Sequence, residues 1–252
     1  MRFLVLQHIE AEHPGILREF MAEDGVRWDA VELDEGDAIP SLDGYDAMVV
    51  MGGPMDVWEE DAHPWLVPEK AAIAEAVRER EMPFLGVCLG HQLLADALGG
   101  EVGSMASPEV GILDVELTED GRRDPVIGSV PATFKALQWH GAEVTRLPAG
   151  AVVLARSPVC PVQAFRVGDS AFGIQYHVEL TGATVHEWGV IPEYAAALER
   201  TLGAGGLDRM QNGANTHMGA FNENARRLYD GFMKVVRERS PRLTHGGRAR
   251  AG

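Results

Sequence analysis

The segment that most constrains the fold of this chain is PFLGVCLGHQLLADALGG, which runs from Pro83 to Gly100. A short apolar run stops at Cys88, and a segment with helical spacing follows it. Gly86 and Gly90 stand two residues before and two residues after the cysteine, which predicts a crowded turn with room only for small neighbours. A strand, a sharp turn and a helix in this order form a nucleophile elbow, written G-x-S-x-G in hydrolases.

The elbow makes Cys88 a candidate nucleophile. At the N-terminus of a helix, the helix dipole favours the thiolate form of a cysteine. The N–H of Leu89 would then point at the site of attack, where it can stabilise an oxyanion. A small buried cysteine in a tight turn would give the same five residues, so the pentapeptide alone leaves both interpretations open.

A base and a group to orient it occur together in FGIQYHVEL, at residues 172–180. If this segment is a strand, alternation places Gln175, His177 and Glu179 on one face. The Glu179 carboxylate could then hold the His177 imidazole, and His177 could act as the base for Cys88. Taken alone, a histidine beside a glutamate on a strand is more often structural than catalytic.

The order of elements predicts an α/β fold. Four apolar runs indicate strands, at 3–8, 26–33, 47–52 and 83–87. Three segments with helical spacing alternate with them, at 14–24, 64–81 and 88–98. This alternation implies right-handed βαβ units and a mainly parallel sheet. A more antiparallel part follows over 101–178, and helical segments follow at 183–201 and 208–239. We therefore expect a single domain over residues 1–239.

Composition limits the partners and the compartment. The net charge of −16 argues against a nucleic-acid surface, which needs clustered Lys and Arg. No apolar run is long enough to cross a bilayer and no signal-peptide pattern begins the chain, so we expect no membrane partner and a cytoplasmic protein. The two cysteines fit a reducing compartment. Residues 240–252 are rich in Gly and Arg, and we expect a disordered basic tail.

The remaining chemistry-bearing residues point to no further site. Cys160 lies between prolines with no helix behind it, which favours a structural cysteine. His8 and His13 flank acidic residues, but their spacing fits no zinc motif, so we predict no metal site. No Walker loop, G-x-G-x-x-G or Gly-rich pyrophosphate loop occurs, so we predict no cofactor.

Three motifs occur in a fixed order: Gly-Gly-Pro at 52–54, G-x-C-x-G-H-Q at 86–92 and Q-x-H-x-E at 175–179. With them, the chain resembles the class I (triad) glutamine amidotransferases over residues 1–180. It is similar to the amidotransferase domain of GMP synthase, to stand-alone relatives of that domain and to the plant γ-glutamyl peptidases. The resemblance implies a flavodoxin-like fold with a mostly parallel central sheet flanked by helices. Residues 182–239 would be a divergent C-terminal helical part of the same domain.

The resemblance also implies roles for individual residues. Cys88 would be the nucleophile, His177 the general base and acid, and Glu179 the residue that orients the imidazole. Gly53 would supply a second oxyanion N–H beside that of Leu89. From the residues alone, the loop containing Gly53 could equally be an ordinary turn after a strand.

Three residues would contact the substrate by the same resemblance. Gln92 would help to hold it, and Trp139 and His140 in LQWHG would lie near the α-amino and α-carboxyl groups of glutamine. The residues alone leave other roles open: Gln92 could pack under the elbow, and Trp139 and His140 could be an aromatic core pair. Two positions depart from the family pattern. Val178 replaces the proline of the usual H-P-E, and Met55 replaces a small hydroxyl residue.

The implied activity is cleavage of the γ-amide of glutamine, or of a γ-glutamyl compound, through a thioester on Cys88. Ammonia could pass to a separate synthetase, because the chain shows no synthetase segment of its own. Alternatively, the protein cleaves γ-glutamyl peptides without a partner. A general thiol hydrolase or a non-catalytic binding protein with the same fold would be further alternatives, although the intact Cys–His–Glu set argues against the last.

Overall fold

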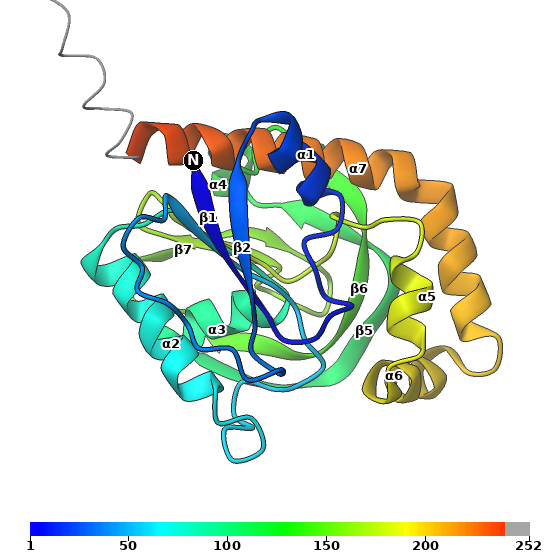
Figure 1. The fold of residues 1–252 in the computed structure, drawn as a ribbon. Coiled ribbons are helices and arrows are strands. Elements are labelled where there is room, and N and C mark those ends of the chain that lie inside the picture. The colour runs from blue at the N-terminus through cyan, green and yellow to red at the C-terminus, as the bar shows by residue number, and fades with distance from the viewer. Residues whose placement is uncertain (240–252) are drawn as a thin grey trace, which may run out of the picture.

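The computed structural model describes residues 1–239, and its first half follows the predicted alternation of strands and helices (Figure 1). The parallel strands are β1 (Arg2–Gln7), β2 (Arg27–Glu32), β3 (Ala47–Val50), β4 (Phe84–Val87) and β9 (Ala171–Ile174). The helices between them are α1 (Leu17–Glu23), α2 (Leu66–Ala74) and α3 (Leu89–Ala97), and a π-helical turn at Glu75–Glu79 extends α2. Strands β3 and β4 are wholly buried because helices cover both faces of the sheet.

The described antiparallel strands continue the same sheet: β5 (Glu101–Leu117), β6 (Thr133–Arg146), β7 (Ala151–Arg156) and β8 (Ala164–Val167). A short helix, α4 (Glu119–Arg123), follows β5, and the Thr118 hydroxyl caps it by accepting the N–H of Gly121 at 2.9 Å. The order across the sheet is β2-β1-β3-β4-β9-β8-β7-β5-β6. The predicted α/β class, with a parallel central sheet flanked by helices, is confirmed.

The described C-terminal part consists of α5 (Thr184–Gly189), α6 (Pro192–Leu202) and α7 (Gly206–Arg239). The prediction of one helix over 183–201 is wrong, because the chain is extended at Ile191, with φ −75° and ψ 125°. Pro192 follows this residue, and a proline disfavours the helical conformation of the residue before it. The predicted disordered tail, 240–252, lies outside the described residues.

Apolar clusters fill the space on both faces of the sheet. On one face, Phe232 of α7 meets Phe3 of β1 edge to face, with ring centroids 6.3 Å apart. Helix α7 runs across this face beside α1 (Figure 1). On the other face, residues of α2 and α3 such as Leu66 and Leu93 pack with Phe84 of β4. Within residues 1–239, no helix is both long enough and apolar enough to cross a membrane.

Candidate active site

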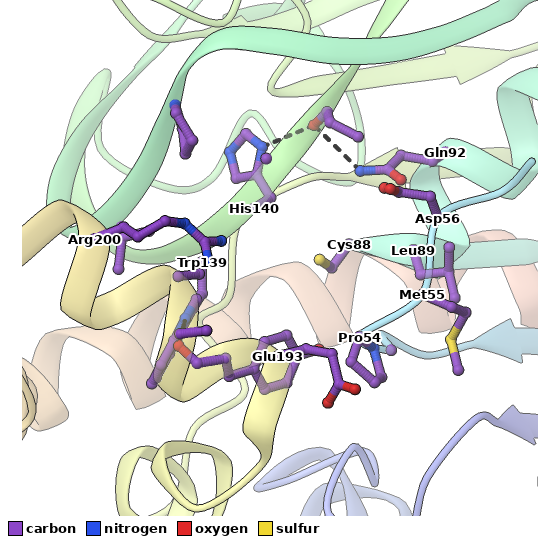
Figure 2. Close-up of a pocket in the computed structure, with 18 residues that line it drawn as sticks. Pro54, Met55, Asp56, Cys88, Leu89, Gln92, Trp139, His140, Glu193 and Arg200 are labelled. Carbon is purple, nitrogen blue, oxygen red and sulfur yellow. Dashed lines mark hydrogen bonds between the residues drawn. The ribbon is translucent and has the colours of Figure 1, made fainter. Parts of the chain in front are cut away.

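Cys88 lies at the turn between β4 and α3, at the carboxyl edge of the parallel strands. Its backbone has φ 52° and ψ −104°, which is strained for a residue with a side chain. The N–H of Cys88 donates to the carbonyl of Ile174 in β9 at 2.8 Å, and this bond ties the turn to the neighbouring strand. The side chain is 5% exposed and reaches a cavity (Figure 2).

The two glycines of the elbow are required by backbone packing. A Cβ atom at Gly86 would lie 2.3 Å from the carbonyl oxygen of Gly90. A Cβ atom at Gly90 would lie 2.1 Å from the carbonyl oxygen of Val50 in β3. Because both obstacles are backbone atoms, no side chain can move aside to relieve the contact. The crowding that the sequence predicted around Cys88 is therefore present on both sides of the turn.

His177 and Glu179 lie side by side, but not as alternate positions of a strand. That prediction is wrong, because β9 ends at Ile174 and His177 makes only an isolated bridge to Leu137 of β6. The Glu179 carbonyl accepts the N–H of Ile16 at 2.8 Å, which draws the chain away from the sheet toward α1. The Glu179 side chain turns back, so that Oε1 lies 2.7 Å from Nδ1 of His177.

Both members of this pair are buried, and each stabilises the charge of the other. Burial alone would lower the pKa of His177, but the Glu179 carboxylate and a hydrogen bond with the Cys88 side chain outweigh burial and raise this pKa well above its usual value. Burial alone would raise the pKa of Glu179, yet that pKa is lowered, because His177 and the N–H of Val178, 3.0 Å from Oε2, stabilise the carboxylate. His177 can therefore carry a proton beside Cys88 at neutral pH.

A cavity of about 380 Å³ opens beside Cys88 (Figure 2). The Gly-Gly-Pro loop after β3, the start of α3, strand β6 and helix α6 form its wall. Gly53 and Leu89 both line it. In the described part of the chain, neither of their backbone N–H groups has an acceptor. Both residues therefore combine a place at the cavity with an N–H group that is not committed to an acceptor in residues 1–239.

Gln92 lines the same cavity and belongs to a chain of amides behind Cys88. Its Nε2 donates to Oε1 of Gln175 at 3.1 Å and to the carbonyl of Ala142 at 3.3 Å. Nε2 of Gln175 in turn lies 3.6 Å from Sγ of Cys88. The structure therefore places Gln92 both at the cavity wall and under the elbow, so that it combines the two positions considered from the sequence.

Trp139 and His140 also line the cavity. Trp139 packs in an aromatic cluster with Trp188 and Tyr194, with centroid distances of 6.2 and 5.4 Å, and its indole N–H donates to the carbonyl of Tyr194 at 3.2 Å. It is thus a core residue with one edge at the cavity. Nδ1 of His140 is hydrogen-bonded to the carbonyl of Ala142 at 2.9 Å, which holds the ring, and Nε2 lies 3.2 Å from the buried carboxylate of Glu109 (Figure 2).

Three residues near the cavity, Tyr194, Arg200 and Glu12, could not be recognised from the sequence. Tyr194 and Arg200 line it from α6, and Figure 2 shows Arg200 pointing into it. The Tyr194 hydroxyl donates to the carboxylate of Glu12. The pKa of Glu12 is raised, because the effect of burial outweighs the charge of His177 and the hydrogen bond from Tyr194, which both lower it. No local pattern links these residues to Cys88, because α6 reaches the elbow only in the folded chain.

The other residues considered from the sequence lie in different surroundings. Cys160 is buried, and burial raises its pKa to about 12, which disfavours a thiolate. His8 contacts Glu69 at 2.9 Å, whereas His13 contacts Arg18 at 3.2 Å. Among residues 1–239, no group of three or more His, Cys, Asp or Glu side chains could hold a metal ion.

A cysteine elbow at the carboxyl edge of a parallel sheet defines a nucleophile-elbow protein of the α/β class. The family of this chain follows from a direct match: residues 16–187 fit the model of "Glutamine amidotransferase class-I". The chain belongs to the class I glutamine amidotransferase family, as the sequence motifs predicted.

Three relatives illustrate the range of the family. Over 152 residues, the chain is 40% identical to the GMP synthase (glutamine-hydrolyzing) of Aeropyrum pernix. The matched segment covers 60% of this chain but only 27% of that protein. It is 35% identical over 153 residues to a GMP synthase (glutamine-hydrolyzing) subunit of Sulfolobus acidocaldarius, covering 60% of this chain and 77% of the relative. It is 31% identical over 182 residues to γ-glutamyl peptidase 3 of Arabidopsis thaliana, covering 69% and 72%.

A solved structure extends the similarity to the C-terminal helices. The crystal structure of a glutamine amidotransferase from Thermotoga maritima matches with a TM-score of 0.81 and 28% identity. The match covers 94% of this chain and 98% of that one. A match this long reaches beyond residue 187, where the family model ends, so the neighbour shares part of the arrangement of α6 and α7.

Proposed function

We propose that this protein hydrolyses the γ-amide bond of glutamine or of a γ-glutamyl compound, with Cys88 as nucleophile. The observation that carries the proposal is the strained elbow: it presents Cys88 to a cavity, beside a buried His177–Glu179 pair whose Nδ1–Oε1 distance is 2.7 Å. Membership of the class I glutamine amidotransferase family supports the reaction class. Both cysteines are free, which fits a reducing compartment such as the cytoplasm.

In the proposed reaction, His177 takes the thiol proton of Cys88, and Sγ attacks the γ-carbonyl carbon of the substrate. The oxyanion that forms is bound by the N–H groups of Leu89 and Gly53. His177 donates a proton to the departing nitrogen as the C–N bond breaks, which leaves a γ-glutamyl thioester on Cys88. Water then attacks the thioester while His177 accepts its proton. The C–S bond breaks, and glutamate and the free thiol are released.

Glu179 keeps His177 oriented and charged through this cycle. Its carboxylate fixes Nδ1 as a hydrogen-bond donor, so the other ring nitrogen is the one that exchanges protons. The Gln92 side chain and the edge of the Trp139 ring offer contacts for the glutamyl part of the substrate, since both residues line the cavity beside the thiol. The chain needs no metal or cofactor for this sequence of steps, because every proton and electron pair is supplied by substrate, water or side chains.

Similarity to the Sulfolobus acidocaldarius GMP synthase subunit favours one version of this activity, in which the ammonia is used by a separate synthetase. Similarity to γ-glutamyl peptidase 3 favours a second version, in which the leaving group is an amino acid or peptide. Arg200 supports the second version. It lines the cavity from α6, outside the family model, and within residues 1–239 it has no ion-pair partner. A guanidinium in this position suits a leaving group that carries a carboxylate.

The test is glutamate release by the purified protein, first from glutamine and then from a γ-glutamyl peptide such as glutathione. Cys88→Ala serves as the control, and intact-mass spectra report a glutamyl adduct on Cys88. Turnover of the peptide without a partner would support the peptidase version. Weak turnover of glutamine that a synthetase stimulates would support the ammonia-donating version. Neither turnover nor adduct with any of these substrates would overturn the proposal in favour of a binding protein.

A further inference from the structure

The peptide unit between Gly52 and Gly53 joins a residue that lines the cavity, Gly53, to a carbonyl that is hydrogen-bonded in the protein interior, that of Gly52. Gly53 lines the cavity, and its N–H has no acceptor among the described residues. The carbonyl of Gly52 accepts a hydrogen bond from Nδ1 of His8 at 2.8 Å. The described chain contains no cis peptide, and a trans unit is planar, with its C=O and N–H pointing in opposite directions. Holding the carbonyl therefore sets the direction of the N–H.

His8 is itself held rigidly at the end of β1. Its Nε2 lies 2.9 Å from Oε1 of Glu69 in α2, and both side chains are completely buried. Trp65 stacks on the imidazole, with ring centroids 5.3 Å apart and an interplanar angle of 25°. A carbonyl oxygen can only accept a hydrogen bond, so Nδ1 carries a proton whichever charge the pair adopts. His8 is thus a permanent donor to Gly52.

The surrounding carboxylates favour the charged form of His8. Burial would lower its pKa, but the Glu69 carboxylate, the Gly52 carbonyl and the charge of Glu12 outweigh burial and raise it. Glu12 also limits the loop sterically, because a Cβ atom on Gly52 would lie 2.5 Å from its Oε2. The peptide unit is therefore enclosed by His8 and Glu12, which leaves it little freedom to rotate.

We propose that His8 and Glu69 are positioning residues that hold the Gly52–Gly53 peptide with the Gly53 N–H directed into the cavity as an oxyanion donor. This inference rests on the proposed function, because it assigns the reaction a second oxyanion N–H. Hydrogen bonding by His8 also polarises the peptide unit, which strengthens the N–H as a donor. Neither side chain lines the cavity, so both act through the peptide rather than on the substrate.

The test uses two substitutions of His8 that differ in which ring nitrogen they replace. In His8→Asn, the amide nitrogen takes the place of Nδ1 and can still donate to Gly52. In His8→Gln, the amide reaches toward Glu69 and leaves the Gly52 carbonyl without a donor. We expect His8→Gln to lower kcat for a γ-glutamyl substrate by about 10- to 100-fold, somewhat less than outright removal of an oxyanion donor, with little change in KM. His8→Asn should recover most of this loss.

Alkylation of Cys88 by iodoacetamide provides the second readout, since this reaction forms no oxyanion. Its rate should be the same in wild type, His8→Gln and His8→Asn. His63→Gln is the matched control. The His63 ring packs on the same Trp65 ring, with centroids 5.4 Å apart, but it makes no hydrogen bond to Gly52. Equal kcat in wild type and His8→Gln would overturn the inference. So would equal losses in both His8 variants, because loss of packing alone gives that result.

Glu69→Gln keeps the proposal testable if His8→Gln does not fold. This variant leaves a partner for Nε2 but removes the carboxylate that favours the charged form of His8, so Nδ1 becomes a weaker donor to Gly52. We expect kcat to fall several-fold while alkylation of Cys88 is unchanged. An unchanged kcat in a folded Glu69→Gln would contradict the inference. If the proposed function is wrong, wild type itself releases no glutamate. If only this inference is wrong, wild type is active and the variants have the same kcat as wild type.

Discussion

Two buried histidine–glutamate pairs in this protein look alike but have different surroundings. In one, Nδ1 of His177 lies 2.7 Å from Glu179, and in the other Nε2 of His8 lies 2.9 Å from Glu69. In both pairs the glutamate helps to raise the pKa of the histidine against the effect of burial. The other group that acts on each ring differs: the Cys88 side chain also raises the pKa of His177, whereas Nδ1 of His8 donates to a backbone carbonyl.

The comparison shows that the third partner decides what such a pair can do. A thiol gives up and takes back a proton, so His177 can act as acid and base in turn. A carbonyl oxygen cannot donate, so His8 remains a fixed donor and can only orient the backbone. A histidine with a buried glutamate is thus not sufficient to identify a catalytic base. The group on the other side of the ring has to be known.

The largest effect is expected at Cys88, whose chemistry gives the His177 pair its separate role. Cys88→Ala should reduce glutamate release to background, and Cys88→Ser should fold normally and lose turnover, because a hydroxyl is a far poorer nucleophile than a thiolate. A glutamate assay and circular dichroism measure the two properties. Turnover by Cys88→Ala would remove the thiol from the mechanism and would erase the distinction between the two pairs.

Replacing the histidines one at a time should rank the pairs. His177→Ala should lower kcat by about 100- to 10,000-fold, because the acid and base are lost in both half-reactions. His8→Gln should cost less, because Cys88 and His177 remain intact. Both values come from kcat at saturating γ-glutamyl substrate. A larger loss in His8→Gln than in His177→Ala would contradict the assignment of roles.

Substituting each glutamate by glutamine, which removes its charge, also compares the contributions of the two pairs to kcat. Glu179→Gln should lower kcat less than His177→Ala, because glutamine can still hold the imidazole, and more than Glu69→Gln. The order is read from kcat of the three purified variants under identical conditions. If Glu179→Gln is slower than His177→Ala, Glu179 does more than orient the ring.

The pH dependence of stability should report the His8 pair. The folded pKa of His8 is raised above 6.5, so its pair stabilises the fold fully below pH 6.5, and this contribution is lost as pH rises through the higher folded pKa. In that window, the free energy of unfolding should fall by about 1 kcal/mol per pH unit for one such group. Urea unfolding of wild type and His8→Asn at a series of pH values tests this. A difference between the two proteins that does not change with pH would show that folding does not raise the pKa of His8.

The smallest effect is expected at Arg200, which belongs to neither pair. Arg200→Gln should raise KM about twofold to fivefold for a γ-glutamyl peptide with a free carboxylate, as expected for an exposed ion pair. KM for glutamine should not change. Arg123→Gln, an exposed arginine remote from the cavity lining, is the matched control. An equal change for both substrates would show that Arg200 does not read the leaving group.

Much of the site was accessible from the sequence because its central parts are local. Gly86, Cys88 and Gly90 lie within five residues, and the turn they make depends on their own backbone contacts and those of adjacent strands. His177 and Glu179 are two residues apart. Here the sequence led to the right neighbours through a wrong argument, since β9 ends at Ile174 and a contact with the start of α1 bends the chain instead.

The family, the alternation of strands and helices, and the elbow at Cys88 could all be predicted from the chain, because each depends on short-range patterns of apolar residues and glycines. The surroundings of the elbow, in contrast, come from contacts between segments far apart in the chain. His8 meets Gly52 across 44 positions and Glu69 across 61, and Arg200 reaches the cavity from a late helix. Such contacts depend on which strands lie side by side and how helices cross them. That order is set by burial of the whole chain, so no periodicity within a segment encodes it.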